Sequence, residues 1–279
     1  MGASDRSAAD PVAEPGEALY LYCLARVSAL AVIEGPGVDG EHSPRLLSFK
    51  DVVAVVGTVR LDDFCGPSAG ARMKDLAWVG SRVCRHHEVV ERAMRRSPVV
   101  PVRFAVIFSS PERLEAWLSI HHDAISQALD RFTNHEEWSV KGTFDRRKSE
   151  ARLLRPAVAR QGGEPPSVGA RYLRERSARA AIGLTLDAWL RQASAGIVGA
   201  LLVHAVEFRG REIVGGTPEE HGTPVGNWAF LVSRRAVNEF AARIESLNAE
   251  YAGQGLTLSR SGPWPPYSFC PPLGPGSSG

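Results

Sequence analysis

The order of apolar and polar positions predicts that strands and helices alternate in the first half of the chain. Residues 19–24 are rich in β-favouring aromatics, and residues 52–59 are apolar at consecutive positions, which is typical of a strand covered on both faces. From Met73 to Met94 the apolar residues recur at three- and four-residue steps, which indicates a helix. The stripe that this helix is expected to bury comprises Met73, Leu76, Ala77, Gly80, Val83, Cys84, His87, Val90 and Met94.

Another strand and another helix follow. Residues 100–108 alternate between apolar and other side chains, which predicts one strand. Ser110 and Pro111 then suit the N-cap and first position of a helix that continues to Phe132, and residues 136–141 predict a last strand. Four strands with two helices on one face would give a modified ferredoxin-like domain.

Proline and glycine divide the chain into domains. Residues 156–168 (PAVARQGGEPPSV) carry the strongest linker composition inside the chain, and they separate predicted domains at residues 18–155 and 169–270. Residues 1–17 and 271–279 are expected to be disordered tails. The fold class is therefore α+β, with two domains that are each a two-layer sandwich of a small, mostly antiparallel sheet with helices on one face.

The second domain begins with a predicted helix over residues 168–193. Its first turns have a narrow apolar stripe formed by Leu173, Ser177 and Ala181, and its later turns are broadly apolar. The remaining elements are expected to be strands at 201–208 and 228–232, a helix at 237–251 and a short strand at 256–258.

Composition is that of an ordinary globular chain, with 44% hydrophobic and 23% charged residues and a net charge of +2. No apolar run reaches the roughly 18 residues that a membrane span requires, and the first eighteen residues lack the apolar core of a signal peptide. The four cysteines have no C-x-x-C spacing, and Cys23 and Cys84 fall at apolar positions. We therefore expect a cytoplasmic protein with reduced, buried thiols.

Nucleophilic catalysis has two weak candidates. Residues 66–70 (GPSAG) match the G-x-S-x-G pattern of serine hydrolases, but no strand leads directly into them and no helix directly follows, so a flexible loop is the favoured interpretation. Cys84 and His87 share a helical face, yet their surroundings favour core packing over an activated thiolate. Glycine patterns that hold nucleotide phosphates are missing from the sequence.

Two histidine pairs could contribute to a metal site. His86–His87 and His121–His122 lie on the two predicted helices of the first domain, and His87 and His121 are expected on their apolar stripes. The spacings do not match known two-histidine metal motifs, so half-buried structural histidines are favoured and no metal or cofactor is expected. A metal-dependent enzyme remains an alternative hypothesis.

The basic residues concentrate around the predicted linker. Residues 145–179 contain ten basic and four acidic side chains, a local charge of +6 that could bind nucleic acid or an acidic partner. Tyr172 is the one aromatic residue in this stretch, so stacking platforms for bases are lacking. A solvated, arginine-rich helix is the simpler interpretation, and a nucleic-acid-binding or regulatory module using residues 146–179 is the alternative.

The sequence SGPWPPYSF at residues 261–269 combines three prolines with three large aromatic rings. Prolines exclude a helix, and a plain linker would not carry these rings. We expect a stiff, extended segment whose rings dock between the domains or on a partner. Its candidate partner-binding or interdomain residues are Gly262, Pro263, Trp264, Pro265, Pro266, Tyr267 and Phe269.

The chain resembles a known family at this segment and at five others in the same order. GPWPPYSF resembles the C-terminal signature of the gas vesicle protein F/L family, whose members are minor proteins of gas vesicle assembly. The other similar stretches are LYLYCLAR (19–26), DLAWVGSRVCRHHEVVE (75–91), PVVPVRFAVIFSS (98–110), EWSVKGTF (137–144) and GARYLRERSAR (169–179).

The resemblance implies a two-domain α+β protein without catalytic activity, cofactor or small-molecule substrate. It would bind the hydrophobic gas vesicle shell protein and other accessory proteins during vesicle nucleation and formation. It would also place the protein in the cytoplasm, associated with gas vesicles, with no nucleic acid partner and no membrane span.

Overall fold

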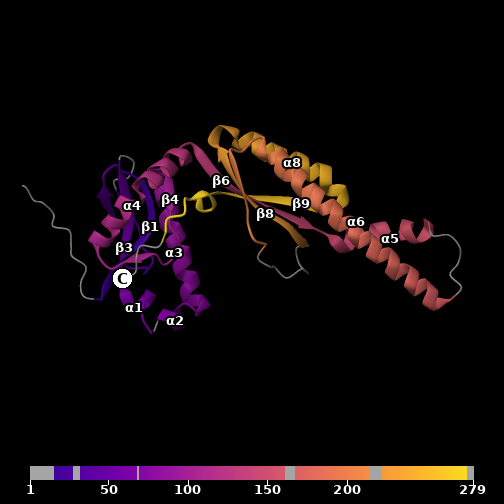
Figure 1. Cartoon of the computed structure of the whole chain (residues 1–279), viewed down its shortest axis with the longest axis horizontal. Coiled ribbons are helices and arrows are strands. Elements are labelled where there is room, and N and C mark those ends of the chain that lie inside the picture. Colours follow the sequence, from indigo (N-terminus) through magenta and orange to yellow (C-terminus); the bar gives the residue numbers. More distant parts are fainter. Residues whose placement is uncertain (1–15, 28–31, 68, 161–166, 214–221, 275–279) are drawn as a thin grey trace, which may run out of the picture. The chain divides into compact units, whose positions relative to one another are not determined.

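The computed structural model describes residues 16–27, 32–67, 69–160, 167–213 and 222–274 (Figure 1). The chain divides into two compact units, of which the first contains residues 1–134 and 265–279 and the second contains residues 135–264. Each unit has its own antiparallel sheet and helices, so the predicted α+β class is confirmed. Of the two predicted tails, residues 1–15 and 275–279 lie outside the described residues.

The first unit contains a five-stranded sheet with the order β2-β3-β1-β4, and β5 also pairs with β1. All of these pairings are antiparallel. The central strand β1 is buried from Ala18 to Ala25, because its apolar side chains point alternately to both faces of the sheet. The strands are β1 (Glu17–Arg26), β2 (Arg45–Phe49), β3 (Val52–Arg60), β4 (Val99–Pro101) and β5 (Ile107–Phe108).

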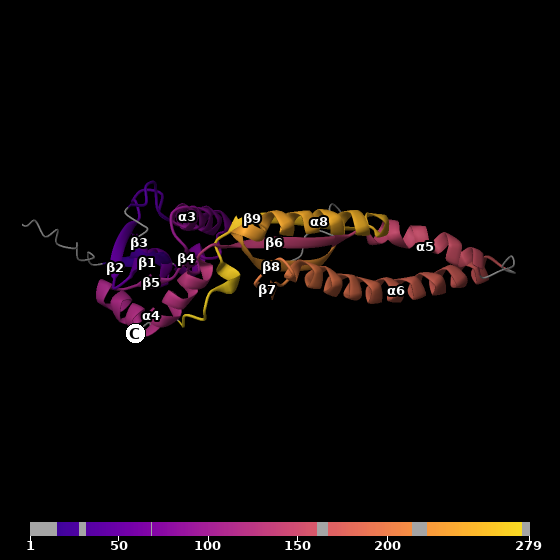
Figure 2. The ribbon, with the colours of Figure 1, turned by 90° about the horizontal axis from the view of Figure 1, so that it is seen from above.

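Two long helices cover opposite faces of this sheet, α3 (Leu76–Met94) and α4 (Pro111–Phe132) (Figure 2). Tyr20 of β1 contacts His86 of α3, whereas Arg26 of β1 hydrogen-bonds the backbone carbonyl of Ser126 in α4. The prediction of both helices on one face is therefore wrong for this unit. A central strand that is apolar on both sides needs cover on both sides. Short helices α1 (Leu61–Phe64) and α2 (Ala69–Arg72) precede α3.

The region predicted as one strand over residues 100–108 is two short strands separated by a loop. Ala105 has a φ of +67°, which an extended strand does not allow. The backbone N–H of Ala105 donates to the Tyr20 hydroxyl at 3.1 Å, and that of Val102 donates to the Tyr22 carbonyl at 3.0 Å. Tertiary hydrogen bonds therefore override the alternating pattern here.

The second unit contains a four-stranded antiparallel sheet with the order β7-β8-β6-β9. Strand β6 (His135–Phe144) is the element predicted to end the first domain, and it lies instead between two strands of the second sheet. The division between the units therefore differs from the predicted one, because β6 finds its backbone partners after residue 222. The other strands are β7 (Glu207–Gly210), β8 (Thr223–Ser233) and β9 (Leu256–Trp264).

Helices α6 (Val168–Leu202) and α8 (Val237–Tyr251) pack on one face of this second sheet. Ile197 of α6 and Ile244 of α8 are buried in the same core as Val140 of β6 and Phe230 of β8. Short 3-10 turns at Arg234–Ala236 and Ala252–Gln254 flank α8. Here the predicted two-layer arrangement with helices on one face agrees with the structure.

The described residues of the predicted linker are mostly helical. Helix α5 (Arg146–Arg160) runs into it, residues 161–166 lie outside the described residues, and Ser167 caps α6 by accepting from the Ala170 N–H at 3.2 Å. Arg146 of α5 forms an ion pair with Asp187 of α6. The predicted strand at residues 201–208 is also wrong in part, since α6 continues to Leu202 and β7 covers only Glu207–Gly210. Among the described residues, no helix has both the length and the apolar character needed to cross a membrane.

Candidate functional site

The structure divides the predicted proline-aromatic segment between the two units. Gly262, Pro263 and Trp264 end β9 in the second unit, whereas Pro265 and the residues after it belong to the first unit. In the second unit, Gly262 has a φ of +136°, and a Cβ there would lie 3.0 Å from the Glu137 carbonyl oxygen. The Trp264 Nε1–H donates to the Ser261 hydroxyl at 3.2 Å. The seven predicted residues are therefore shared between the two units.

Within the first unit, residues 265–274 are anchored at several points; we call them the C-terminal segment. Pro265 and Pro266 are buried, and Phe269 is 2% exposed in a 3-10 turn at Tyr267–Phe269. Tyr267 is 36% exposed, and its ring stacks on His87 of α3 with centroids 6.3 Å apart. The anchoring of Tyr267 and Phe269 indicates a structural role for these rings in the first unit.

Further anchors come from residues that the sequence did not single out. The Arg131 guanidinium donates to the Phe269 carbonyl. The Cys270 thiol donates to the Pro101 carbonyl at 3.5 Å, and the Trp117 Nε1–H donates to the Gly274 carbonyl at 3.0 Å. Pro271 and Pro272 extend the proline pattern of the preceding residues, and this was the available signal that the stiff segment continues past Phe269.

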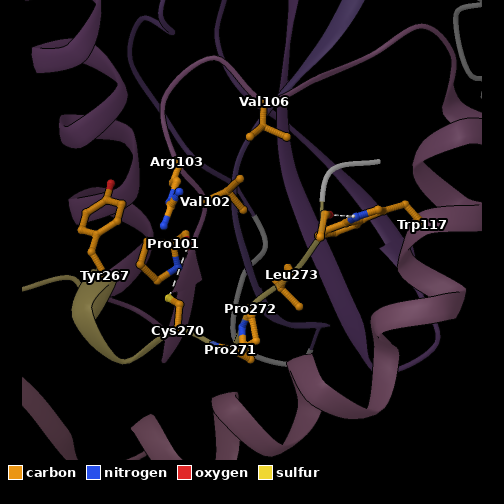
Figure 3. A pocket seen from close by; sticks show the side chains of 11 residues that line it. Pro101, Val102, Arg103, Val106, Trp117, Tyr267, Cys270, Pro271, Pro272 and Leu273 are labelled. Atoms are coloured by element: carbon orange, nitrogen blue, oxygen red, sulfur yellow. Dashed lines mark hydrogen bonds between the residues drawn. The ribbon is translucent and has the colours of Figure 1, made fainter. Parts of the chain in front are cut away.

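A groove of about 580 Å³ lies between the C-terminal segment, the 101–106 loop and Trp117 (Figure 3). Among the described residues that line it, Arg103 is the only charged one, and the others are mostly apolar. Such a groove suits an apolar group or an extended peptide, because it offers contact area and few polar partners. Its lining residues are Pro101, Val102, Arg103, Val106, Trp117, Tyr267, Cys270, Pro271, Pro272, Leu273 and Gly274.

The histidine pairs take structural positions in the first unit. His86 is the buried member of its pair, so the prediction of His87 on the buried stripe is wrong. The Tyr20 hydroxyl lies 2.9 Å from His86 Nδ1, and His86 Nε2 lies 3.0 Å from the Val102 carbonyl. Burial lowers the pKa of His86 to about 4, because the charged imidazolium is disfavoured away from water.

The second pair lies on α4. His122 contacts Asp51 at 2.7 Å, while the His121 ring lies 4.8 Å from the Trp117 ring. His87 lies 3.3 Å from Glu91 on α3. In the described parts of the chain, no three His, Cys, Asp or Glu side chains are grouped in a way that could hold a metal ion. The arrangement therefore offers packing and hydrogen bonding at these histidines.

The remaining nucleophile candidates are Ser68 and Cys84. Ser68 of the GPSAG sequence lies outside the described residues. Cys84 is exposed on α3, so its predicted burial is wrong, whereas Cys23 is fully buried and burial raises the pKa of its thiol. The predicted stripe of α3 is rotated relative to the buried face, since Leu76 is 86% exposed. The buried residues of α3 are His86, Val89, Val90 and Ala93.

The arginine-rich stretch forms much of the pair of helices α5 and α6. Arg146 pairs with Asp187 and lies 3.5 Å from Glu150, and Arg152 donates to the Gly253 carbonyl. These two arginines therefore stabilise the second unit. Arg171, Arg176 and Arg179 are exposed on α6.

Comparison with known proteins identifies the family. The sequence matches the family described as "Gas vesicle synthesis protein GvpL/GvpF" over residues 18–271. The chain belongs to the GvpL/GvpF family. The matched range includes both sheets and the C-terminal segment as far as Pro271.

Curated relatives include both named branches of the GvpL/GvpF family. Gas vesicle protein L of a Streptomyces species is 28% identical over 260 residues, covering 90% of this chain and 91% of that protein. Gas vesicle protein F of the same strain is 26% identical, with 90% of this chain and 98% of that protein covered. Gas vesicle protein L2 of Halobacterium salinarum is 25% identical, with 94% of each covered.

Solved structures of the GvpL/GvpF family share the fold. Gas vesicle protein GvpF from Anabaena sp. PCC7120 superposes with a TM-score of 0.67 at 16% identity, covering 91% of this chain and 96% of that one. GvpF from Microcystis aeruginosa gives a TM-score of 0.59 at 14% identity, with coverages of 91% and 99%.

Proposed function

We propose that this GvpL/GvpF chain is a non-enzymatic structural and assembly protein of gas vesicles, which binds the hydrophobic shell protein and accessory proteins as vesicles nucleate and form. The family match over residues 18–271 carries this proposal, because it includes both sheets and most of the C-terminal segment. Members of this family take part in gas vesicle formation. The protein would act in the cytoplasm in association with the vesicle.

The chemistry of the described surface is compatible with such binding. Large apolar side chains are exposed in both units, including Leu76 and Ile120 in the first and Leu184 in the second. A shell subunit that has not yet polymerised exposes apolar area, and covering it would contribute about 2.5 kcal/mol for each 100 Å² removed from water. Burial of this apolar area would therefore drive binding of the shell subunit, and no chemical transformation is needed.

The proposal is tested by producing the tagged full chain together with the gas vesicle shell protein and the accessory gas vesicle proteins. We expect the shell protein to be recovered with the chain in soluble form, and to aggregate when the chain is omitted. A tagged globular protein of similar size serves as the control. Recovery of none of the gas vesicle proteins by a folded chain would contradict the proposal.

A second measurement addresses the role in cells. Deleting the gene in a vesicle-forming host is expected to abolish or strongly reduce vesicles, and the full chain should restore them. Normal vesicle number without the gene would contradict an assembly role.

A further inference from the structure

Helix α6 is apolar on the side that faces solvent as well as on the side that faces the sheet. Its inner side contributes Leu186, Leu190 and Ile197 to the core of the second unit. Its outer side exposes Leu184 to 74% and Leu202 to 39%. A surface helix of a globular protein normally has one apolar side, so this second side lacks the usual polar character.

The exposed side continues along most of the helix at steps of three or four residues. It includes the narrow apolar stripe of the first turns, and Leu173 of that stripe is 64% exposed. From Leu173 to Leu202 it extends about 44 Å at a helical rise of 1.5 Å per residue. We call this surface the outer band; it comprises Leu173, Ser177, Ala181, Leu184, Ala188, Arg191, Ala195, Gly199 and Leu202, all of them exposed.

Helix α8 of the same unit provides a comparison. Its exposed positions include Glu239, Glu245 and Glu250, as expected for a helix that faces water. In the outer band, Arg191 is the one charged residue. Alanine and glycine allow another helix to approach closely, and the spaced leucines supply side chains that can insert between its turns. The outer band therefore has the shape and composition of a helix-packing surface.

The charges beside the outer band indicate the kind of helix that it accepts. Arg171, Arg176, Arg179 and Arg191 are exposed on α6. Asp187, the acid in the later turns of the helix, forms an ion pair with Arg146 of α5. A second copy of α6 would carry the same excess of arginines, and like charges oppose association, whereas acidic side chains would be attracted.

We propose that the outer band of α6 binds an amphipathic helix of another gas vesicle protein, whose apolar stripe is flanked by acidic residues. This inference rests on the proposed function and adds the surface and the class of partner. Apolar contact along the band supplies the affinity, and the arginines select the partner and its orientation.

Site-specific crosslinking tests the surface directly. The photoreactive residue p-benzoylphenylalanine replaces Ala188 in the outer band or, as the matched control, the exposed Ala242 of α8. Each full chain is produced with the shell protein and the accessory gas vesicle proteins, and crosslinked peptides are identified by mass spectrometry. We expect position 188, and not position 242, to capture an acidic amphipathic helix of one of these proteins. Capture of a second copy of the chain, or equal capture at both positions, would overturn the proposal.

Charge substitutions provide an independent readout of binding. Ala188→Glu with Ala195→Glu places carboxylates in the band, and we expect at least tenfold less gas vesicle protein to be recovered. Ala242→Glu with Ala249→Glu makes the same change on exposed positions of α8 and should leave recovery unchanged. Should the α6 variant fail to fold, Arg176→Glu with Arg179→Glu removes the attraction at exposed positions and is expected to give a similar loss.

The outcomes separate this inference from the proposed function. If the unmodified chain recovers no gas vesicle protein, both fail. If the unmodified chain recovers gas vesicle proteins and the folded α6 variants recover as much, the outer band is not the binding surface and only this inference fails.

Discussion

Tyr20 of strand β1 and His86 of helix α3 are joined by a 2.9 Å hydrogen bond inside the core of the first unit. The Val102 carbonyl can only accept, so His86 Nε2–H donates to it and His86 Nδ1 accepts from the Tyr20 O–H. The Ala105 N–H donates in turn to the Tyr20 oxygen. The neutral imidazole is thus satisfied at both nitrogens. This chain of bonds joins β1, α3 and the 101–106 loop that lines the groove.

The His86 network predicts that stability depends on pH. The pKa of His86 is about 4 in the folded chain and about 6.5 when unfolded, so below pH 6.5 the unfolded chain binds a proton that the folded chain does not. The free energy of unfolding should therefore fall as the pH drops from 6.5 to 4, by about 3 kcal/mol from this residue. Urea unfolding at a series of pH values measures this loss.

A His86→Gln variant is the control for that measurement. Its baseline stability is expected to be lower, but the part of the pH dependence that belongs to His86 should disappear. An unchanged slope between pH 4 and 6.5 in this variant would assign the effect to other groups.

Gly57 of β3 is expected to tolerate no side chain. A Cβ at this position would lie 2.8 Å from the Tyr22 hydroxyl oxygen and 3.1 Å from the edge of its buried ring. Gly57→Ala should therefore destabilise the first unit by about 1–3 kcal/mol through overpacking. Gly80→Ala on α3 is the matched control, because nothing lies within 4 Å of its added Cβ. Thermal unfolding of both variants measures the difference. Equal melting temperatures for Gly57→Ala and Gly80→Ala would refute overpacking at position 57.

Phe269 is expected to be the main anchor of the C-terminal segment. Its side chain is 2% exposed, so Phe269→Ala should lower the free energy of unfolding of the first unit by about 3–5 kcal/mol. Tyr267→Ala removes a ring that is 36% exposed and should have a smaller effect. Denaturant unfolding monitored in the first unit compares the two, and a larger loss for Tyr267→Ala would contradict this assignment.

The cysteines should differ sharply in reactivity. Cys65 and Cys84 are exposed, whereas Cys23 is fully buried and burial raises the pKa of its thiol. An alkylating reagent should modify Cys65 and Cys84 within minutes in the native state and reach Cys23 only after unfolding. Peptide mass spectrometry over time locates the modified residues. Early modification of Cys23 would contradict its burial, and protection of Cys84 would contradict its exposure.

The candidate site shows where prediction from sequence reaches its limit. Prolines and aromatic rings at residues 262–269 predicted a stiff segment that docks between the domains or on a partner, and Phe269 is buried within the first unit. The anchors Trp117 and Arg131 lie more than a hundred residues away in sequence, and no local pattern connects them to the segment. Long-range contacts of this kind leave no periodic signal.

The sequence alone determined the local elements. Alternation and helical spacing located most strands and helices, and Ser110 with Pro111 marked the start of α4, where the serine hydroxyl accepts from the Arg113 N–H. These features depend on neighbours within one or two turns. The tertiary structure decided that β6 belongs to the second sheet and which side of α3 and α6 is buried. Strand pairing and the choice between two apolar sides of a helix depend on residues far along the chain, which a local pattern does not encode.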